Sequence, residues 1–288
     1  LPPGTAGRKV ARTNLSCDAV NDIIQQWLNR NGYRGPSWLA KIGIQRRPLF
    51  IYLHYMDVHG PYMAPGKYNN IFYSHFLALP PREVTEADRQ KLKYLDLGFD
   101  NANLYTSRYD GQILYFDSRL KDFLAGLRTR GLLDQSIVVL TADHGESLGE
   151  HNDWDHRYDI YQTNIHVPLI MVGLPGAVKA GTVKETASLV DLAPTLLEAL
   201  AAPIPAEFEG HSLLSAAQGK DPAPARAWSE NHLDREHMVA EIKGYEKTIY
   251  RAPELTPTET YNIQADPGEL NNLLSQKKQK DVREAQNK

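Results

Sequence analysis

Asp143 and His144 stand side by side directly after a short apolar run, in the stretch SIVVLTADHG (136–145). The apolar run predicts a buried strand, and the pair follows at its end, where α/β proteins often hold ligands. A carboxylate oxygen beside an imidazole nitrogen suits Ca²⁺, Mn²⁺ or Zn²⁺ without selecting one of them. Spacing alone leaves a second interpretation open, in which Asp143 caps the backbone and His144 is an ordinary loop residue.

More histidines lie near this pair or follow another apolar run. Three interpretations are open for His151 and His156: further metal ligands, hydrogen-bond donors to an anion, or solvated loop residues. Arg157 would offer a fixed positive charge to an oxyanion, although a lone arginine is more often a surface residue. His59 follows the run PLFIYLHY (48–55) and precedes a Gly-Pro turn that would hold it in place. Histidines after two separate predicted strands favour a site at the carboxyl ends of a sheet.

Strands that alternate with helices would position these side chains. Near-continuous apolar runs predict strands buried on both faces within 48–55, 136–145 and 167–176. Helical spacing predicts helices at 18–32 with Asp18 as N-cap, within 85–130, and at 189–200 with Asp191 as N-cap and Pro194 in the first turn. The alternation predicts an α/β fold with a parallel or mixed sheet flanked by helices.

The composition and the hydrophobic pattern of the sequence change after residue 200. Connectors rich in Pro, Ala and Gly precede short strand-like pieces, and the pair Lys243-Gly244 indicates a hairpin. We therefore expect a small antiparallel sheet at the C-terminal end. The predicted domains are 1–215, the α/β part, and 216–288, a small α+β subdomain.

Composition excludes several classes of function. The 288 residues are 42% hydrophobic, and 32 Lys+Arg against 35 Asp+Glu give a formal charge of -3, so no positive field would attract nucleic acid. No apolar run of membrane-spanning length is present, and the opening residues lack the apolar core of a signal peptide. Neither a nucleic-acid partner nor a membrane segment is expected, and the sequence does not indicate an oligomeric state.

Six motifs follow one another along the chain: FIYLHYMDVHGPYMAP (50–65), VVLTADHGESLGEH (138–151), YQTNIHVPLIMVGLPG (161–176), SLVDLAPTLLEALAAP (188–203), EGHSLL (209–214) and ETYNIQADPGELNNL (259–273). In these motifs and in their order, the chain resembles sulfatases of the alkaline phosphatase superfamily over nearly its whole length. The implied fold is an alkaline phosphatase-like mixed sheet flanked by helices, with a small C-terminal antiparallel sheet.

The resemblance also implies roles for individual residues. Asp143 and His144 resemble metal ligands, and His59 resembles the substrate-contacting, catalytic histidine of an HxP loop. His156 is the first candidate for sulfate binding and catalysis, and Arg157 is the second because it falls where many sulfatases carry a sulfate-binding lysine. The implied cation is Ca²⁺, with Mn²⁺ or Zn²⁺ as alternatives.

Two features of the family are not found in these residues. A first strand with a pair of aspartate ligands, and the CxPSR motif whose cysteine or serine becomes the formylglycine nucleophile, do not occur. Cys17, in NLSCDAVND, lacks the proline and arginine and is predicted to be structural. The chain therefore resembles the C-terminal two-thirds of a sulfatase. The nucleophile is expected upstream, and the chain by itself is expected to be inactive.

The implied activity is hydrolysis of a small-molecule or carbohydrate sulfate ester. One alternative is a phosphodiester or phosphonate monoester hydrolase of the same superfamily, and another is a non-catalytic sulfatase-like module. The resemblance favours an extracytoplasmic location, periplasmic or secreted.

Overall fold

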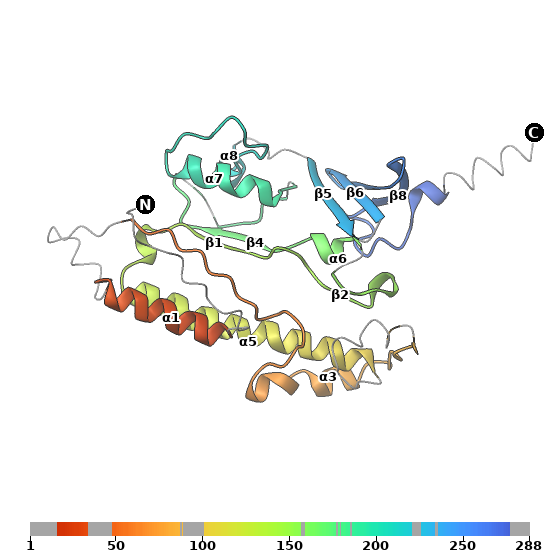
Figure 1. Cartoon of the computed structure of the whole chain (residues 1–288), viewed down its shortest axis with the longest axis horizontal. Helices are drawn as coiled ribbons and strands as arrows, with labels where there is room; N and C mark the ends of the chain where they lie inside the picture. Colours follow the sequence, from red (N-terminus) through yellow and green to blue (C-terminus); the bar gives the residue numbers. More distant parts are fainter. Residues whose placement is uncertain are drawn as a thin grey trace, which may run out of the picture. The chain divides into compact units, whose positions relative to one another are not determined.

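The structure is a computed structural model that describes residues 16–33, 48–86, 88, 101–156, 159–176, 178, 180–184, 186–220, 226–233 and 236–276. The chain divides into two compact units, residues 1–136 and 137–288, and each is described by itself (Figure 1). The domain boundary predicted after residue 215 stays a prediction. Among the described residues, no helix combines the length and apolarity needed to cross a membrane.

The first unit is built on two long helices that lie side by side (Figure 1). Its elements are α1 (Cys17–Arg30), the 3-10 helix η1 (Gly66–Asn70), α3 (Tyr73–Leu77), α5 (Ala102–Thr129) and the 3-10 helix η3 (Leu133–Gln135). The Arg130 guanidinium, just after α5, donates to the side chains of Gln25 at 2.8 and 3.0 Å and Asn29 at 2.8 Å on α1. The helices predicted at 18–32 and within 85–130 are confirmed.

The N-cap of α1 is Ser16 and not the predicted Asp18. The Ser16 hydroxyl accepts a hydrogen bond from the backbone N–H of Ala19 at 3.4 Å, and its ψ of 157° is non-helical, as an N-cap requires. Asp18 lies in the first turn, where its carboxylate accepts a hydrogen bond from the Tyr115 hydroxyl of α5. The prediction was wrong because the Asp18 side chain contacts α5 and does not cap the end of α1.

Cys17 has the environment of a structural cysteine. Its side chain is fully buried in a cluster with Ala64 and Tyr115. Burial, followed by the nearby Asp57 carboxylate, raises the pKa of the thiol to about 12. A thiol that stays protonated at neutral pH is a poor nucleophile, which agrees with the structural role predicted for it.

The strand predicted at 48–55 is not formed. Residues 48–56 make no strand pairing, and Phe50 and Tyr52 expose 86% and 76% of their surface. A strand needs a neighbour that pairs its backbone groups and layers that cover its side chains. No described residue provides such a neighbour for this segment.

All strand pairs among the described residues of the second unit are antiparallel. The pairs are β1 (Val138–Thr141) with β4 (Leu169–Val172), β2 (Ser147–Leu148) with β3 (Trp154–Asp155), and the sheet β5 (Arg226–Leu233), β6 (Glu236–Lys243), β7 (Glu246–Arg251) and β8 (Thr256–Asn262). The strands predicted within 136–145 and 167–176 are thus confirmed. The prediction of burial on both faces was wrong for β4, because Ile170 and Val172 are 52% and 60% exposed.

Short helices complete the second unit. They are η4 (Glu150–Asn152), α6 (Gln162–Ile165), η5 (Leu189–Asp191), α7 (Leu192–Ala199) and α8 (Leu214–Ala217). Asp191 occupies the predicted N-cap position of α7, with Pro194 buried in the first turn. However, its carboxylate caps the preceding turn, because it accepts hydrogen bonds from the backbone N–H groups of Ser188 and His211, both at 2.8 Å.

The C-terminal sheet encloses a small apolar core. The predicted hairpin is confirmed, since β6 and β7 are joined at Gly244, whose φ of +59° suits a glycine. Five buried side chains form the core: Ile160, Met238, Ala240, Ile249 and Tyr261. Ile160 lies outside the sheet, so the core also fixes the segment that leads into α6.

A buried ion pair joins β7 to the closing segment of the chain. The Lys247 ammonium and a Glu269 carboxylate oxygen approach to 2.6 Å, without aligned hydrogen-bond geometry, and the two side chains are 0% and 1% exposed. Lys247 also donates to the carbonyl of Ile160 at 2.7 Å, and Glu269 accepts from the backbone N–H of Gln162 at 2.6 Å. Desolvation lowers the pKa of Lys247, although the Glu269 charge opposes this. The pair therefore holds residues 160–162 from both sides.

Replacing Glu269 by Gln should destabilise the protein by about 3–5 kcal/mol, because a buried lysine loses its counter-charge. Urea unfolding followed by circular dichroism measures the change. The control is Asp122→Asn, which removes the ion pair of an exposed aspartate with Arg119 on α5 and should cost about 0–1 kcal/mol. The double change Lys247→Met/Glu269→Leu should be more stable than Glu269→Gln. A loss for Glu269→Gln no larger than that of the control would contradict this role.

Glu259 should make the second unit sensitive to acid. Burial disfavours its carboxylate, but hydrogen bonds from Tyr261, Arg251 and Tyr161 outweigh burial and hold the pKa below the ordinary 4.5. Because the pKa of Glu259 is lower in the folded state than in the unfolded state, its ionised carboxylate stabilises the fold at pH values above the ordinary pKa. This stabilisation is lost as the pH falls through the folded-state pKa. The stability difference between wild type and Glu259→Gln, from urea unfolding, should shrink from about pH 7 to about pH 3. A constant difference would disprove the linkage.

Candidate active site

Asp143 and His144 follow β1 directly, as predicted, and present their ligand atoms together. The Asp143 side chain is 74% exposed and that of His144 is 38% exposed. A carboxylate oxygen of Asp143 lies 3.8 Å from Nε2 of His144. The same oxygen accepts a hydrogen bond from the backbone N–H of His144 at 3.1 Å, which limits its rotation. Two such atoms can bind one divalent cation, and the oxygen–nitrogen donor set fits Ca²⁺, Mn²⁺ or Zn²⁺.

The hydrogen bond of His144 selects the tautomer that metal binding needs. Its Nδ1 donates to the carbonyl of Gly145 at 2.7 Å. The proton is therefore on Nδ1, and Nε2 carries the lone pair that a cation requires. A backbone carbonyl behind the ring is a common arrangement for metal-binding histidines.

The loop after His144 is fastened to α6. The backbone N–H groups of Gly145 and Glu146 donate to the carbonyls of Asn164 at 2.7 Å and Thr163 at 3.0 Å. The Ser147 hydroxyl, which is fully buried, donates to the Asn164 side chain at 3.3 Å. The contact is so close that a Cβ added at Gly145 would lie 2.0 Å from the Thr163 oxygen. Only glycine allows this approach.

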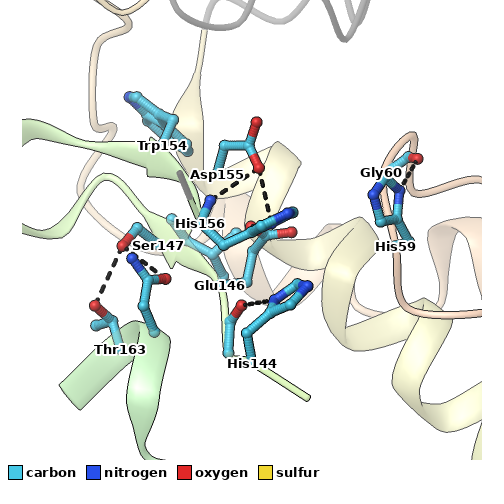
Figure 2. Close-up of polar contacts among 12 residues, drawn as sticks. His59, Gly60, His144, Glu146, Ser147, Trp154, Asp155, His156 and Thr163 are labelled. Atoms are coloured by element: carbon cyan, nitrogen blue, oxygen red, sulfur yellow. Dashed lines mark hydrogen bonds and ion pairs between the residues drawn. The ribbon is translucent and has the colours of Figure 1, made fainter. Parts of the chain in front are cut away.

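His156 lies against His144, as Figure 2 shows. The two imidazole rings are stacked, with centroids 3.8 Å apart and planes inclined by 22°. Nδ1 of His156 is 2.8 Å from a carboxylate oxygen of Asp155 and 3.0 Å from one of Glu146. The structure therefore brings together three of the predicted site residues and adds two carboxylates to them.

The two carboxylates favour the protonated form of His156. Hydrogen bonds to Asp155 and then to Glu146 raise the pKa of the imidazole to about 9, although burial opposes them. A charged imidazolium at neutral pH can attract a sulfate oxygen, as an arginine or lysine would. This agrees with the predicted anion-binding role of His156.

The structure does not support a ligand role for His151 or test one for Arg157. His151 stacks on the Tyr161 ring, with centroids 3.6 Å apart, and its Nε2 donates to the carbonyl of Gly268 at 3.1 Å. These contacts fasten η4 to the closing segment, so the structure supports a positional role for His151 rather than the ligand role considered from the sequence. Arg157 lies outside the described residues, and its role stays a prediction.

His59 belongs to the first unit and sits beside a strained residue. Its Nδ1 donates to the carbonyl of Gly60 at 2.7 Å, the same arrangement that His144 has with Gly145. Val58 has a φ of +96°, a conformation that costs a β-branched residue about 1–3 kcal/mol and that is found most often at functional sites. This strain supports the choice of His59 as a functional residue.

Sequence reasoning missed Glu146 and Asp155. Both lie within the acidic stretch around His144 and His156, but their types and spacing alone do not show that they meet at one nitrogen. That meeting depends on the pairing of β2 with β3, which places Asp155 opposite Ser147. An acidic residue immediately before a candidate anion-binding histidine was the one available signal.

Comparison with protein families identifies the family of the chain. The family model described as Sulfatase matches residues 24–202, well over half of the chain. The chain belongs to the sulfatase family. A second model, described as N-sulphoglucosamine sulphohydrolase, C-terminal, matches residues 149–288 of the chain.

Curated sulfatases share moderate identity with this chain. An N-acetylglucosamine-6-O-sulfatase of Bacteroides thetaiotaomicron is 33% identical over 192 residues, covering 62% of this chain and 34% of the relative. Arylsulfatase K of Danio rerio is 30% identical over 249 residues, covering 84% of this chain and 43% of the relative. The chain thus spans a third to a half of the length of these relatives.

Solved structures confirm the predicted alkaline phosphatase-like fold class. BT4656, in complex with its substrate D-glucosamine-2-N,6-O-disulfate, matches with a TM-score of 0.59 and 21% identity, covering 97% of this chain and 70% of the solved chain. The phosphonate monoester hydrolase of Silicibacter pomeroyi matches with a TM-score of 0.68 and 21% identity, covering 96% and 63%. At these identities the likeness shows the fold alone.

Replacing Gly145 by Ala should displace Asp143 and His144, because the new methyl group cannot fit against the Thr163 carbonyl. Loss of the Gly145–Asn164 hydrogen bond and the forced shift should destabilise the protein by about 1–3 kcal/mol. Thermal unfolding measures the change. Gly268→Ala is the control, because that glycine has no positive φ and an added Cβ would meet only Leu270 side-chain atoms, at 3.6 Å or more. An equal or smaller loss at Gly145 would show that the loop adapts to the methyl group.

Proposed function

We propose that the protein is a sulfuric ester hydrolase whose active site includes Asp143, His144 and His156. The observation that carries this proposal is the stacking of His156 on His144 at the end of β1, in a chain of the sulfatase family. One arrangement offers two ligands for a cation and, beside them, a positively charged group for an oxyanion. Hydrolysis of a sulfate ester needs both, because negative charge develops on the sulfate oxygens and on the leaving oxygen.

The described residues would divide the work as follows. Asp143 and Nε2 of His144 would hold a divalent cation, Ca²⁺ first with Mn²⁺ or Zn²⁺ as alternatives, and that cation would supply charge stabilisation. His156, together with Arg157, would bind sulfate oxygens. His59 would contact the substrate and assist the departure of the alcohol through its imidazole. The nucleophile would be a formylglycine from an upstream segment that completes the site.

We infer a sulfated carbohydrate as the substrate class. Support comes from the names of similar proteins, since one relative is an N-acetylglucosamine-6-O-sulfatase and one solved structure holds a disulfated glucosamine. An extracytoplasmic location, which the resemblance to sulfatases favours, is part of the proposal. Which sulfated position is cleaved would depend on residues that line the sugar.

Phosphonate monoester hydrolysis is the second candidate. The phosphonate monoester hydrolases of Silicibacter pomeroyi and Agrobacterium radiobacter give TM-scores of 0.68 and 0.69, higher than that of BT4656. Fold similarity does not fix the substrate, since one fold serves several reactions. The matching family models and the curated relatives are sulfatases, which favours the sulfate ester.

The full-length protein should hydrolyse an aryl sulfate with a higher kcat/KM than the matching aryl phosphonate. Asp143→Asn and His144→Gln should each lower sulfate turnover by about 100-fold or more, because each removes a ligand of the cation. Asp134→Asn, which changes an exposed aspartate of the first unit, is the control and should leave turnover unchanged. A higher kcat/KM for the phosphonate would replace the proposal by its second candidate. Absence of both activities in protein that carries formylglycine would reject the two together.

A further inference from the structure

Glu146 and Asp155 converge on one nitrogen of His156 (Figure 2). The separations are 3.0 Å from the Glu146 oxygen and 2.8 Å from the Asp155 oxygen to Nδ1. The three side chains are largely shielded from water, with 9%, 26% and 23% of the side chains of Glu146, Asp155 and His156 exposed. Because both carboxylates can only accept, Nδ1 must carry the proton that they share.

The backbone holds both carboxylates in place. The N–H of Glu146 is fastened to the Thr163 carbonyl at 3.0 Å, and Asp155 is paired with Ser147 between β3 and β2. Asp155 has a φ of +79°, a left-handed conformation that a residue other than glycine rarely adopts. Its carboxylate also accepts from the backbone N–H of His156 at 2.8 Å. The strained backbone at Asp155 thus holds its carboxylate against the His156 ring.

The contrast with His144 shows what these contacts add. The Nδ1 of His144 donates to a neutral backbone carbonyl, whereas the Nδ1 of His156 donates to two carboxylates. Both arrangements leave Nε2 as the ring nitrogen that would serve a ligand. Behind a neutral carbonyl, Nε2 suits a cation; behind two anions, Nε2–H suits an anion.

We propose that Glu146 and Asp155 are positioning residues that fix the ring of His156 so that its Nε2–H contacts a sulfate oxygen of the substrate. This inference rests on the proposed function, which assigns sulfate binding to His156. A competing use exists for the same three side chains, because their ligand atoms all lie within 4.8 Å of one another and could hold a cation. The Nδ1 separations of 2.8 and 3.0 Å are those of hydrogen bonds, which favours the positioning role.

A double-mutant cycle in the full-length enzyme tests whether the carboxylates act through His156. Glu146→Gln and Asp155→Asn should each lower kcat/KM for an aryl sulfate by about 10–100-fold, the usual cost of losing a group that orients a histidine. In a His156→Gln background the same changes should cost less than about 3-fold, because the oriented ring is gone. Glu150→Gln is the matched control, since that carboxylate in the same loop accepts from the backbone N–H of Leu148. Equal losses in both backgrounds would overturn the proposal.

A spectroscopic measurement keeps the positioning role testable if turnover is absent. In full-length protein labelled with ¹⁵N-histidine, His156, assigned through His156→Gln, should show a protonated Nδ1 that exchanges slowly. Glu146→Gln/Asp155→Asn should abolish this slow exchange, and an unchanged signal would overturn the proposal. Ca²⁺ or Zn²⁺ added to chelator-treated protein should leave the Nδ1 proton in place, and its loss on titration would assign the cluster to a cation instead. Wild-type protein without sulfate turnover would reject the proposed function alone.

Discussion

The geometry of the site depends on a charge pair buried in the second unit, Lys247 with Glu269. Both side chains are removed from water, so each charge is tolerable only because the other is present. Each side chain also hydrogen-bonds to the backbone, Lys247 to the carbonyl of Ile160 and Glu269 to the N–H of Gln162. The C-terminal sheet thereby sets the position of the first residues of α6, a helix too short to be stable by itself.

From α6 the constraint passes to the residues that would meet the substrate. Asn164 and Thr163 fix the backbone of Gly145 and Glu146, and His144 lies one residue before them. The contact works because Gly145 has no side chain, which lets two backbones approach more closely than any other residue permits. A sheet distant in sequence thus determines where the predicted metal ligands stand.

Local patterns predicted the three longest described helices and the strand that ends before Asp143 and His144, because helical spacing and apolar runs are properties of neighbouring residues. The strand at 48–55 failed because a strand also needs a partner, which no apolar run specifies. The convergence of Glu146 and Asp155 was equally hidden, since it depends on the register of β2 with β3 and on the positive φ of Asp155. Contacts between residues far apart in the sequence could not be predicted from local patterns.

The choice of histidine at position 156 explains why such contacts are needed. A lysine ammonium group can donate hydrogen bonds in several directions, because it carries three N–H donors that rotate together. An imidazole donates from a ring edge in one direction, so it binds an anion only when the ring is held at the right rotation. Stacking on His144 fixes the plane of the ring, and the two carboxylates fix its rotation within that plane. Binding of a sulfate through His156 would therefore need more residues around the ring than binding through a lysine, and Glu146 and Asp155 are in place to meet that need.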